Sequence, residues 1–163
     1  MSVEDTYIAA SLGNIDKLSG LKEHWDKYTA SYAAKEGHLE CLKYLHKNGE
    51  CKHWTITLNA AVSGHLDCLN FCLENKVAYT AEIPVAVSNC ENGSVECFIR
   101  LFQQWRHPYV FWNNPFYNQK FINNKIDLND ERWAPLFDKE VDLRYYPELQ
   151  YRVNIKKKVI KKN

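Results

Sequence analysis

Cysteine and histidine are the residues in this chain whose types and spacing could support metal chemistry. His65, Cys68 and Cys72 are spaced i, i+3 and i+7, so on a helix they would share one face. Three cysteines, however, recur at one position, each four residues after a glycine: Cys41, Cys68 and Cys97. A thiol that recurs in this way indicates packing, because reduced cysteine behaves as a small apolar side chain. We therefore expect structural thiols and no metal site.

Catalytic chemistry has no comparable set of residues in the sequence. Nothing suggests a base, a nucleophile and an orienting group that converge in one pocket. The chain has six glycines, and they occur singly, so no glycine-rich loop is available to hold a phosphate. We expect a protein that is not an enzyme, with no catalytic residue, no cofactor and no small-molecule substrate.

The glycines instead mark a repeated segment, and this repeat determines the predicted fold. Successive glycines of the repeat lie 24, 27 and 29 residues apart. The four copies are Gly13-Asn14-Ile15-Asp16-Lys17-Leu18, Gly37-His38-Leu39-Glu40-Cys41-Leu42, Gly64-His65-Leu66-Asp67-Cys68-Leu69 and Gly93-Ser94-Val95-Glu96-Cys97-Phe98. A small residue stands three positions before each glycine: Ala10, Ala34, Ala61 and Cys90.

Each copy contains the signals of a helix–turn–helix unit. A first helix is expected to begin at a threonine N-cap, at Thr29, Thr55 and Thr80. Alanine pairs at 9/10, 33/34 and 60/61 would let first helices lie close together, and the glycine would end each one in the left-handed conformation. The second helix has apolar residues at helical spacing and an acid in its first turn.

One such unit cannot bury its apolar face alone, and stacking several units solves this problem. The sequence therefore predicts an all-α fold of stacked helix–turn–helix repeats over residues 1–104, in about four units.

The best two units resemble the ankyrin-repeat family. The resemblance is carried by Thr55-Ile56-Thr57-Leu58-Asn59-Ala60-Ala61 followed by Gly64-His65-Leu66-Asp67, and by the segment from Ala33 to Leu45. The units are shorter than the ankyrin repeat of about 33 residues, because the linker from Gly49 to Thr55 leaves no room for a β-hairpin. A cysteine near the turn, an aromatic residue before the threonine and the segment GHLECLKYLHKNG are similar to the short ankyrin-like repeats, of about 27 residues, of giant DNA viruses and some protists. The resemblance implies an ankyrin-like solenoid in which His38 and His65 hydrogen-bond the backbone and hold the turn.

Composition is that of an ordinary globular protein, with 45% hydrophobic and 25% charged residues. No apolar run approaches the roughly 18 residues of a membrane span, and the first residues, MSVEDTYIAASL, do not form a secretory signal. We therefore expect no membrane partner, reduced cysteines and a cytoplasmic or nuclear location, or the host cytoplasm or virion if the chain is viral.

The repeat pattern stops at residue 105, and a different composition follows. The segment WRHPYVFWNNPFYN contains six aromatic residues and two prolines in fourteen positions. Residues 105–151 are interpreted as an extension that caps the last repeat, or alternatively as a patch that docks a partner. Residues 118–150 are expected to be irregular, with one or two short helices.

Charge separates the two ends of the chain. Residues 1–104 have 9 Lys/Arg and 13 Asp/Glu, whereas residues 105–163 have 12 and 7. The last part, residues 152–163, has six basic residues and no acid, and we expect it to be solvated and disordered when free. It would serve as a solubilising end, as a contact for an anionic partner, or as a nuclear-import signal.

The resemblance implies a function in binding another protein, through the face that is concave in ankyrin arrays. The expected partner-binding residues are Lys35, Lys52, His53, Trp54, Asn59, Ser63 and, in the aromatic segment, Trp105 and Trp112. Two alternatives remain open: a structural component of a larger assembly, such as a virion, anchored by the C-terminal extension, or nucleic-acid binding through the basic tail.

Overall fold

The computed structural model describes residues 2–90, 94–104, 111–112, 114–137, 141 and 143–162. Within these ranges the chain is helical and has no β-strand, which confirms the predicted all-α class. The described linker between Gly49 and Thr55 accordingly has no hairpin.

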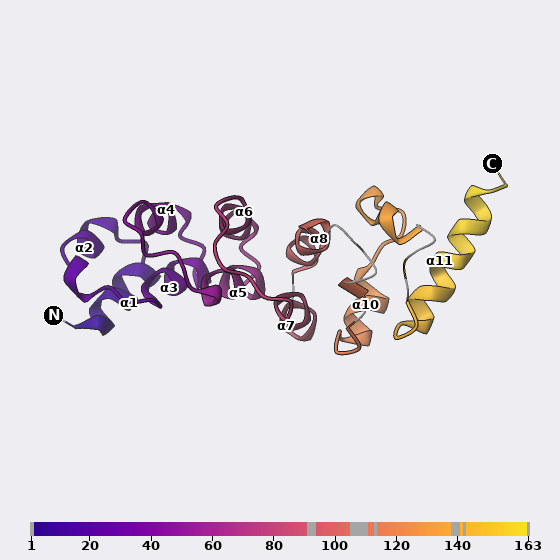
Figure 1. The fold of residues 1–163 in the computed structure, drawn as a ribbon, viewed down its shortest axis with the longest axis horizontal. Helices are drawn as coiled ribbons and strands as arrows, with labels where there is room; N and C mark the ends of the chain where they lie inside the picture. The colour runs from indigo at the N-terminus through magenta and orange to yellow at the C-terminus, as the bar shows by residue number, and fades with distance from the viewer. Residues whose placement is uncertain are drawn as a thin grey trace.

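Helices α1 to α8 pack in two rows (Figure 1). The first row is α1 (Val3–Ser11), α3 (Thr29–Lys35), α5 (Trp54–Val62) and α7 (Ile83–Asn89). The second row is α2 (Ile15–Ser19), α4 (Leu39–Lys47), α6 (Leu66–Glu74) and α8 (Val95–Gln104), with a 3-10 turn, η1 (Lys22–His24), after α2. Each helix contacts its neighbours in its own row and its partner in the other row. The helices therefore form pairs stacked in series.

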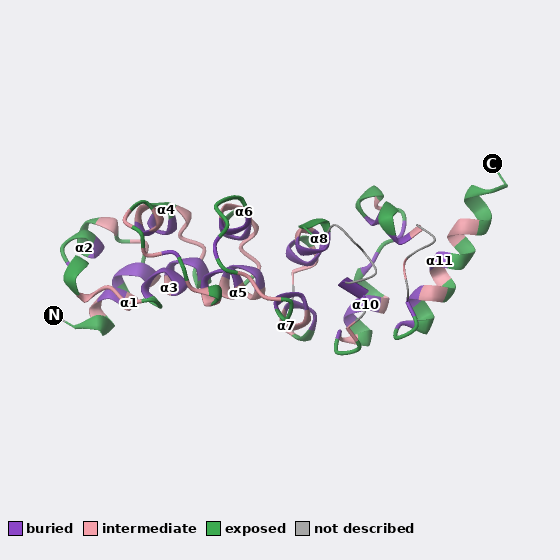
Figure 2. Ribbon diagram, in the orientation of Figure 1, coloured by how far each residue is buried: buried purple, intermediate pink, exposed green. Residues whose placement is uncertain are grey.

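Small side chains allow the first row to pack closely. The alanine pairs at 9/10, 33/34 and 60/61 are completely buried, as predicted. Leucines of the second row, namely Leu18, Leu42, Leu45 and Leu69, are also completely buried. The buried residues of each pair lie largely where the helices face one another (Figure 2), so burial of apolar surface holds the stack together.

The first helices end at glycine, as the sequence predicts. Gly37 and Gly64 have φ angles of +78° and +81°, which a side chain would disfavour. The next backbone N–H folds back onto the helix: His38 donates to the Ala33 carbonyl at 2.9 Å, and His65 to the Ala60 carbonyl at 2.9 Å. This is the Schellman ending, and it reverses the chain into the second helix. The fourth glycine of the pattern, Gly93, lies outside the described residues.

The predicted N-caps Thr29, Thr55 and Thr80 are wrong by one or more positions. Before α3, the Asp26 carboxylate accepts the backbone N–H of Thr29 at 3.0 Å, while the Thr29 hydroxyl accepts that of Asp26 at 3.0 Å. Asp26 therefore supplies the capping carboxylate, and Thr29, in the first turn of α3, returns a hydrogen bond to the Asp26 backbone. The residue before α5 is His53, and the residue before α7 is Glu82.

Two histidines connect successive helix pairs. The His38 imidazole lies with Nε2 2.8 Å from the carbonyl oxygen of Ser11, in the preceding pair. In the next pair, the His65 Nε2 lies 2.9 Å from the carbonyl oxygen of Lys35. Because a carbonyl only accepts, Nε2 donates in both bonds. The histidines thus bond the backbone, as the resemblance implied, but they hold the neighbouring unit rather than their own turn.

The rings also lie against the glycines of the preceding pair. A Cβ added at Gly13 would lie 2.8 Å from Nδ1 of His38, and one added at Gly37 would lie 2.6 Å from Nδ1 of His65. At the last junction Ser94 takes the place of histidine, and a Cβ on Gly64 would lie 3.4 Å from the Ser94 Cβ. Glycine and histidine therefore form a matched pair across the first two junctions.

Aromatic rings cover the last second-row helix. The extension contributes rings from residues 111–112, α10 (Gln119–Lys125) and η2 (Glu131–Phe137). The Phe98 ring of α8 has five of them within 5.1 to 6.3 Å, centroid to centroid: Phe111, Trp112, Tyr117, Phe121 and Trp133. We name these six residues the ring cluster, and all six are buried. The cluster keeps the apolar face of α8 from water.

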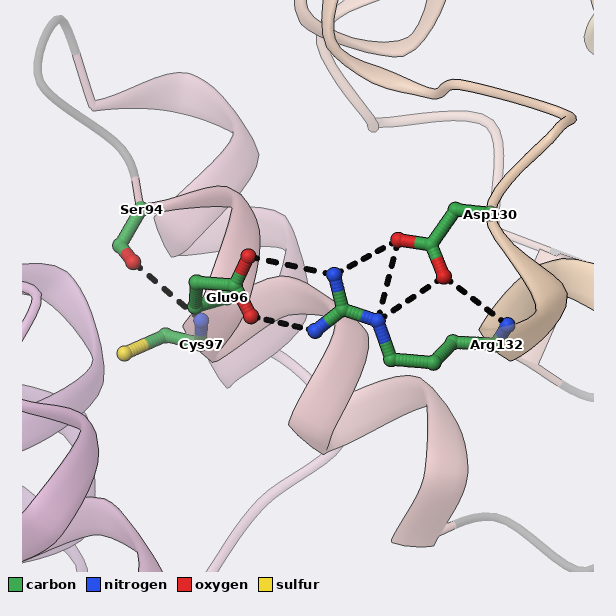
Figure 3. Close-up of polar contacts among 5 residues, drawn as sticks. All are labelled: Ser94, Glu96, Cys97, Asp130 and Arg132. Carbon is green, nitrogen blue, oxygen red and sulfur yellow. Dashed lines mark hydrogen bonds and ion pairs between the residues drawn. The ribbon is translucent and has the colours of Figure 1, made fainter.

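An ion pair adds little to this attachment. Arg132 of η2 contacts the carboxylates of Glu96, on α8, and Asp130 (Figure 3). The side chains of Arg132 and Glu96 are 40% and 52% exposed, so water and salt screen the pair. Such exposed pairs contribute about 1 kcal/mol or less. Burial of the ring cluster is therefore the main attachment of the extension.

The basic tail is helical over residues 152–160, contrary to the prediction that residues 152–163 are disordered when free. It continues helix α11 (Pro147–Ile160), so the predicted boundary after residue 151 falls inside a helix. Leu149 and Val153 are completely buried, one turn apart. The Arg152 guanidinium donates to the carbonyls of Asn123 and Ile126. These contacts anchor the first half of α11 to the extension.

Candidate partner-binding surface

A groove lined by tyrosines runs across the first row. Its cavity of about 310 Å³ lies among side chains of three successive helix pairs, which we name the tyrosine groove: Tyr7, Tyr28, Ser31, Tyr32, Lys35, Thr55 and Asn59. The helices α1, α3 and α5 position these residues because each packs on the next.

Stacking and one carboxylate hold the rings in place. Tyr7 and Tyr32 stack with their centroids 4.4 Å apart. The Tyr7 hydroxyl donates to Asp26 at 2.6 Å, and this bond is the main cause that raises the pKa of Tyr7 to about 12. Burial alone would raise the pKa of Asp26, but the hydrogen bonds from Tyr7, Tyr28 and Thr29 outweigh it and lower that pKa. Asp26 thus starts α3 and fixes a ring of the preceding unit.

Polar groups form the base of the groove. The hydroxyls of Ser31 and Thr55 lie 2.6 Å apart, and Asn59 donates through Nδ2 to the Ser31 carbonyl at 3.2 Å. These bonds link α3 with α5. The bond to the Ser31 carbonyl uses only the amide nitrogen of Asn59, so its amide oxygen keeps its acceptor capacity.

A second cavity, of about 230 Å³, adjoins the groove at the connector between α4 and α5. Its lining is Lys27, Gly49, Glu50, Lys52 and His53, and we name it the lysine cavity. The Tyr28 ring belongs to both surroundings, because Lys27 Nζ lies 4.9 Å from its centroid and the His53 ring lies 5.3 Å away. Tyr28 of the groove thus lies next to two residues that line the lysine cavity.

Half of the eight predicted partner-binding residues line these cavities. Lys35 and Asn59 line the tyrosine groove, and Lys52 and His53 line the lysine cavity. Trp54 is 41% exposed, beside His53 at a centroid distance of 5.7 Å. The structure thus brings together side chains from α3, α5 and the connector.

Three predicted residues lie elsewhere. Ser63 is exposed after the end of α5 and lines neither cavity. Trp105 lies outside the described residues. Trp112 is completely buried, which contradicts its assignment to an exposed surface, because the ring cluster encloses it.

Sequence reasoning missed the tyrosines. Tyr7, Tyr28 and Tyr32 were not among the predicted partner-binding residues. Tyr7 and Tyr32 lie six and five positions before their glycines, so they do not share a repeat position that could have marked them.

A further exposed surface lies on α11. Tyr151, Ile155 and Val159 are spaced four residues apart and are 64%, 46% and 50% exposed. Ile155 and Val159 also line a cavity of about 370 Å³ together with Leu128 and Lys156. Basic residues surround these side chains, so α11 presents apolar and cationic groups together.

Metal ligands do not gather in the part of the chain that the structure describes. No group of three or more His, Cys, Asp or Glu residues there is arranged to hold an ion. Cys68 and Cys72 are buried, and the Nε2 of His65 bonds a backbone carbonyl. None of the described helices is long and apolar enough to cross a membrane.

Thiol labelling tests the packing role of the cysteines. Cys90 is half-buried, whereas the other five are buried, and burial raises the pKa of Cys51 and of Cys72 to about 12. Since the thiolate is the reactive form, we expect a disulfide reagent at pH 8 to modify Cys90 rapidly and the others only after unfolding. Cys90→Ser should remove the fast phase. Rapid reaction of a second thiol in the native protein would contradict the assignment.

In comparisons with known proteins, the chain matches no family model, no curated protein and no solved structure.

Proposed function

We propose that the chain is an ankyrin-like solenoid that binds another protein and catalyses no reaction. The repeated Gly-His turn, the alanine pairs and the two stacked rows of helices support the ankyrin-like assignment. The units are short, and their described connectors have no β-hairpin, as in the short repeats that the sequence resembles.

One observation carries the proposed function. The tyrosine groove and the lysine cavity are neighbours, because Tyr28 of the groove lies against Lys27 and His53 of the cavity. Together they present aromatic, hydroxyl and amino groups from three successive helix pairs. Tyrosine and tryptophan are the side chains most enriched among energetically important interface residues. Tyr28 of the groove and Trp54, beside His53, are 38% and 41% exposed, so a partner can bury them.

The double substitution His53→Ala/Trp54→Ala tests this surface. We expect the variant to capture its partner at least about tenfold more weakly, since truncation of a well-packed aromatic anchor costs roughly 2 kcal/mol or more. The measurement is capture from cell extract by the full chain, quantified by mass spectrometry, with helicity checked by circular dichroism.

A matched control lies on the second row. The His46 and Phe71 rings also form an edge-to-face pair, 5.3 Å apart, between α4 and α6. His46→Ala/Phe71→Ala should leave capture unchanged among molecules that remain folded. Equal capture by wild type and by the His53/Trp54 variant would exclude the first-row surface as the binding site.

The exposed face of α11 favours a second candidate, in which the basic end binds nucleic acid or anchors the chain in a larger assembly. Removing residues 105–163 cannot test this, because that deletion would uncover Phe98 and Phe102 of α8. Lys158→Gln/Lys161→Gln/Lys162→Gln is a better arm of the same capture experiment, since these side chains are exposed. Loss of capture in this variant alone would assign the function to α11.

A further inference from the structure

We infer that the first-row surface selects an acidic peptide segment, bound in an extended form along the tyrosine groove and the lysine cavity. This inference rests on the proposed function and adds the chemistry of the partner.

The charges at the two cavities are mainly positive. Lys27, Lys35 and Lys52 line them, and Glu50 is the one acidic residue in the two linings. Asp26 also lies near, but Tyr7 and the start of α3 already use its carboxylate. The ammonium groups of Lys35 and Lys52 make no hydrogen bond or ion pair with any part of the chain that the structure describes. An acidic ligand would therefore gain charge pairs without breaking existing ones.

The rings favour a peptide over a nucleic acid. Single-stranded nucleic acids bind proteins by stacking bases on free aromatic faces. Here Tyr7 and Tyr32 stack on each other, and the Lys27 ammonium lies over the Tyr28 ring at 4.9 Å. These rings therefore offer mainly edges and hydroxyls. Such groups pack well against aliphatic side chains and hydrogen-bond backbone amides.

The polar base matches an extended backbone. An extended segment alternates its N–H and C=O groups and needs partners for both along its length. The groove offers the amide oxygen of Asn59 as an acceptor and the hydroxyls of Tyr28 and Tyr32 as donors, from adjacent helices. Clustered lysines without arginine suit single carboxylates, because the compact ammonium group acts as a point charge.

Selection from a library of random peptides tests the inference on the full chain. One arm uses the wild type, a second uses Lys35→Glu/Lys52→Glu, and a third uses Lys17→Glu/Lys47→Glu, which changes net charge equally on the exposed second row. The strongest peptides are then synthesised with a fluorophore and titrated by anisotropy at two salt concentrations.

We expect the wild type and the Lys17/Lys47 control to enrich peptides rich in Asp and Glu. These peptides should bind Lys35→Glu/Lys52→Glu about tenfold more weakly or worse, and their affinity should fall as salt rises. Enrichment of neutral or basic peptides would overturn the inference, and so would equal affinity of the selected peptides for the wild type and for Lys35→Glu/Lys52→Glu. A fluorescent single-stranded oligonucleotide is titrated in the same way, and tighter binding of it than of the selected peptides at this surface would also overturn the inference. The proposed function fails separately, through unchanged capture by the His53/Trp54 variant.

Discussion

Replacement of Phe98 by alanine is expected to lower the free energy of unfolding by about 3 to 5 kcal/mol. Phe98 is completely buried, and five other rings surround it. The substitution would remove apolar contacts and leave a cavity at the point where the extension covers α8. Neighbouring rings come from separate segments, so they cannot all move inward to fill it.

The loss should be larger at the C-terminal end than in the first three helix pairs. Helix pairs contact their neighbours in series, so weakening the extension destabilises the adjacent pair, α7 and α8, before the others. Hydrogen exchange should therefore show reduced protection in α8, α10 and α11 before α3 to α6. Urea unfolding followed by tryptophan fluorescence gives the total change.

Phe116→Ala is the matched control for Phe98→Ala. It removes the same atoms from a side chain that is 74% exposed, so its effect should stay within about 0.5 kcal/mol. Phe98→Leu keeps much of the volume and should cost less than Phe98→Ala. Equal stability of the two alanine variants would show that the ring cluster does not attach the extension.

Local patterns were enough to predict the helix pairs. The alanine pairs, the left-handed glycines and the leucines of the second helices each act within a few residues of their neighbours, so their spacing determines what they do. The N-cap of α3 was misplaced because two residues compete for one role. Thr29 can cap a helix, but Asp26 three residues earlier caps it more strongly and uses Thr29 as its partner.

The extension could not be predicted in the same way. Its contacts join residues far apart in sequence, such as Phe98 with Trp133 and Tyr117 with Tyr146. No period connects them, so the sequence favoured a cap for the aromatic segment but left a docking patch open. The helix of the basic tail did have a local signal: Pro147 and Glu148 suit a first turn, and Leu149 and Val153 are spaced for one buried face. The run of lysines hid that signal.

The candidate site was predicted in part for a related reason. Lys35, Lys52, His53 and Asn59 follow from analogy between the first helices of stacked repeats. Tyr7 joins them only because its hydroxyl bonds Asp26, nineteen residues away, and its ring stacks on Tyr32. Such contacts depend on the angle between units, and that angle is a property of the whole stack.

The junction between units gives the second large effect. Gly37→Ala places a methyl group at φ +78° and 2.6 Å from Nδ1 of His65. Left-handed backbone costs a non-glycine residue about 1 to 2 kcal/mol, and forced overpacking adds about 1 to 3 kcal/mol. We therefore expect Gly37→Ala to destabilise the protein by roughly 2 to 5 kcal/mol, measured by urea unfolding.

Gly49→Ala separates these two contributions. Gly49 has a similar φ angle of +88°, but nothing lies within 4 Å of the Cβ position. Its substitution should cost only the backbone part, about 1 to 2 kcal/mol. The difference between the two glycine variants then measures the contact with the next unit.

Removal of the histidine ring should relieve that contact. His65→Ala alone loses the hydrogen bond to the Lys35 carbonyl, which contributes about 1 kcal/mol. In the His65→Ala background, however, Gly37→Ala should cost no more than Gly49→Ala, which gives a coupling energy of about 1 to 3 kcal/mol. If the effects of Gly37→Ala and His65→Ala on the free energy of unfolding were additive, the His65 ring would move aside without cost and the two residues would not be coupled. Strong coupling would instead make the glycine of one unit and the histidine of the next a single structural element, so that either residue constrains the other when units are joined.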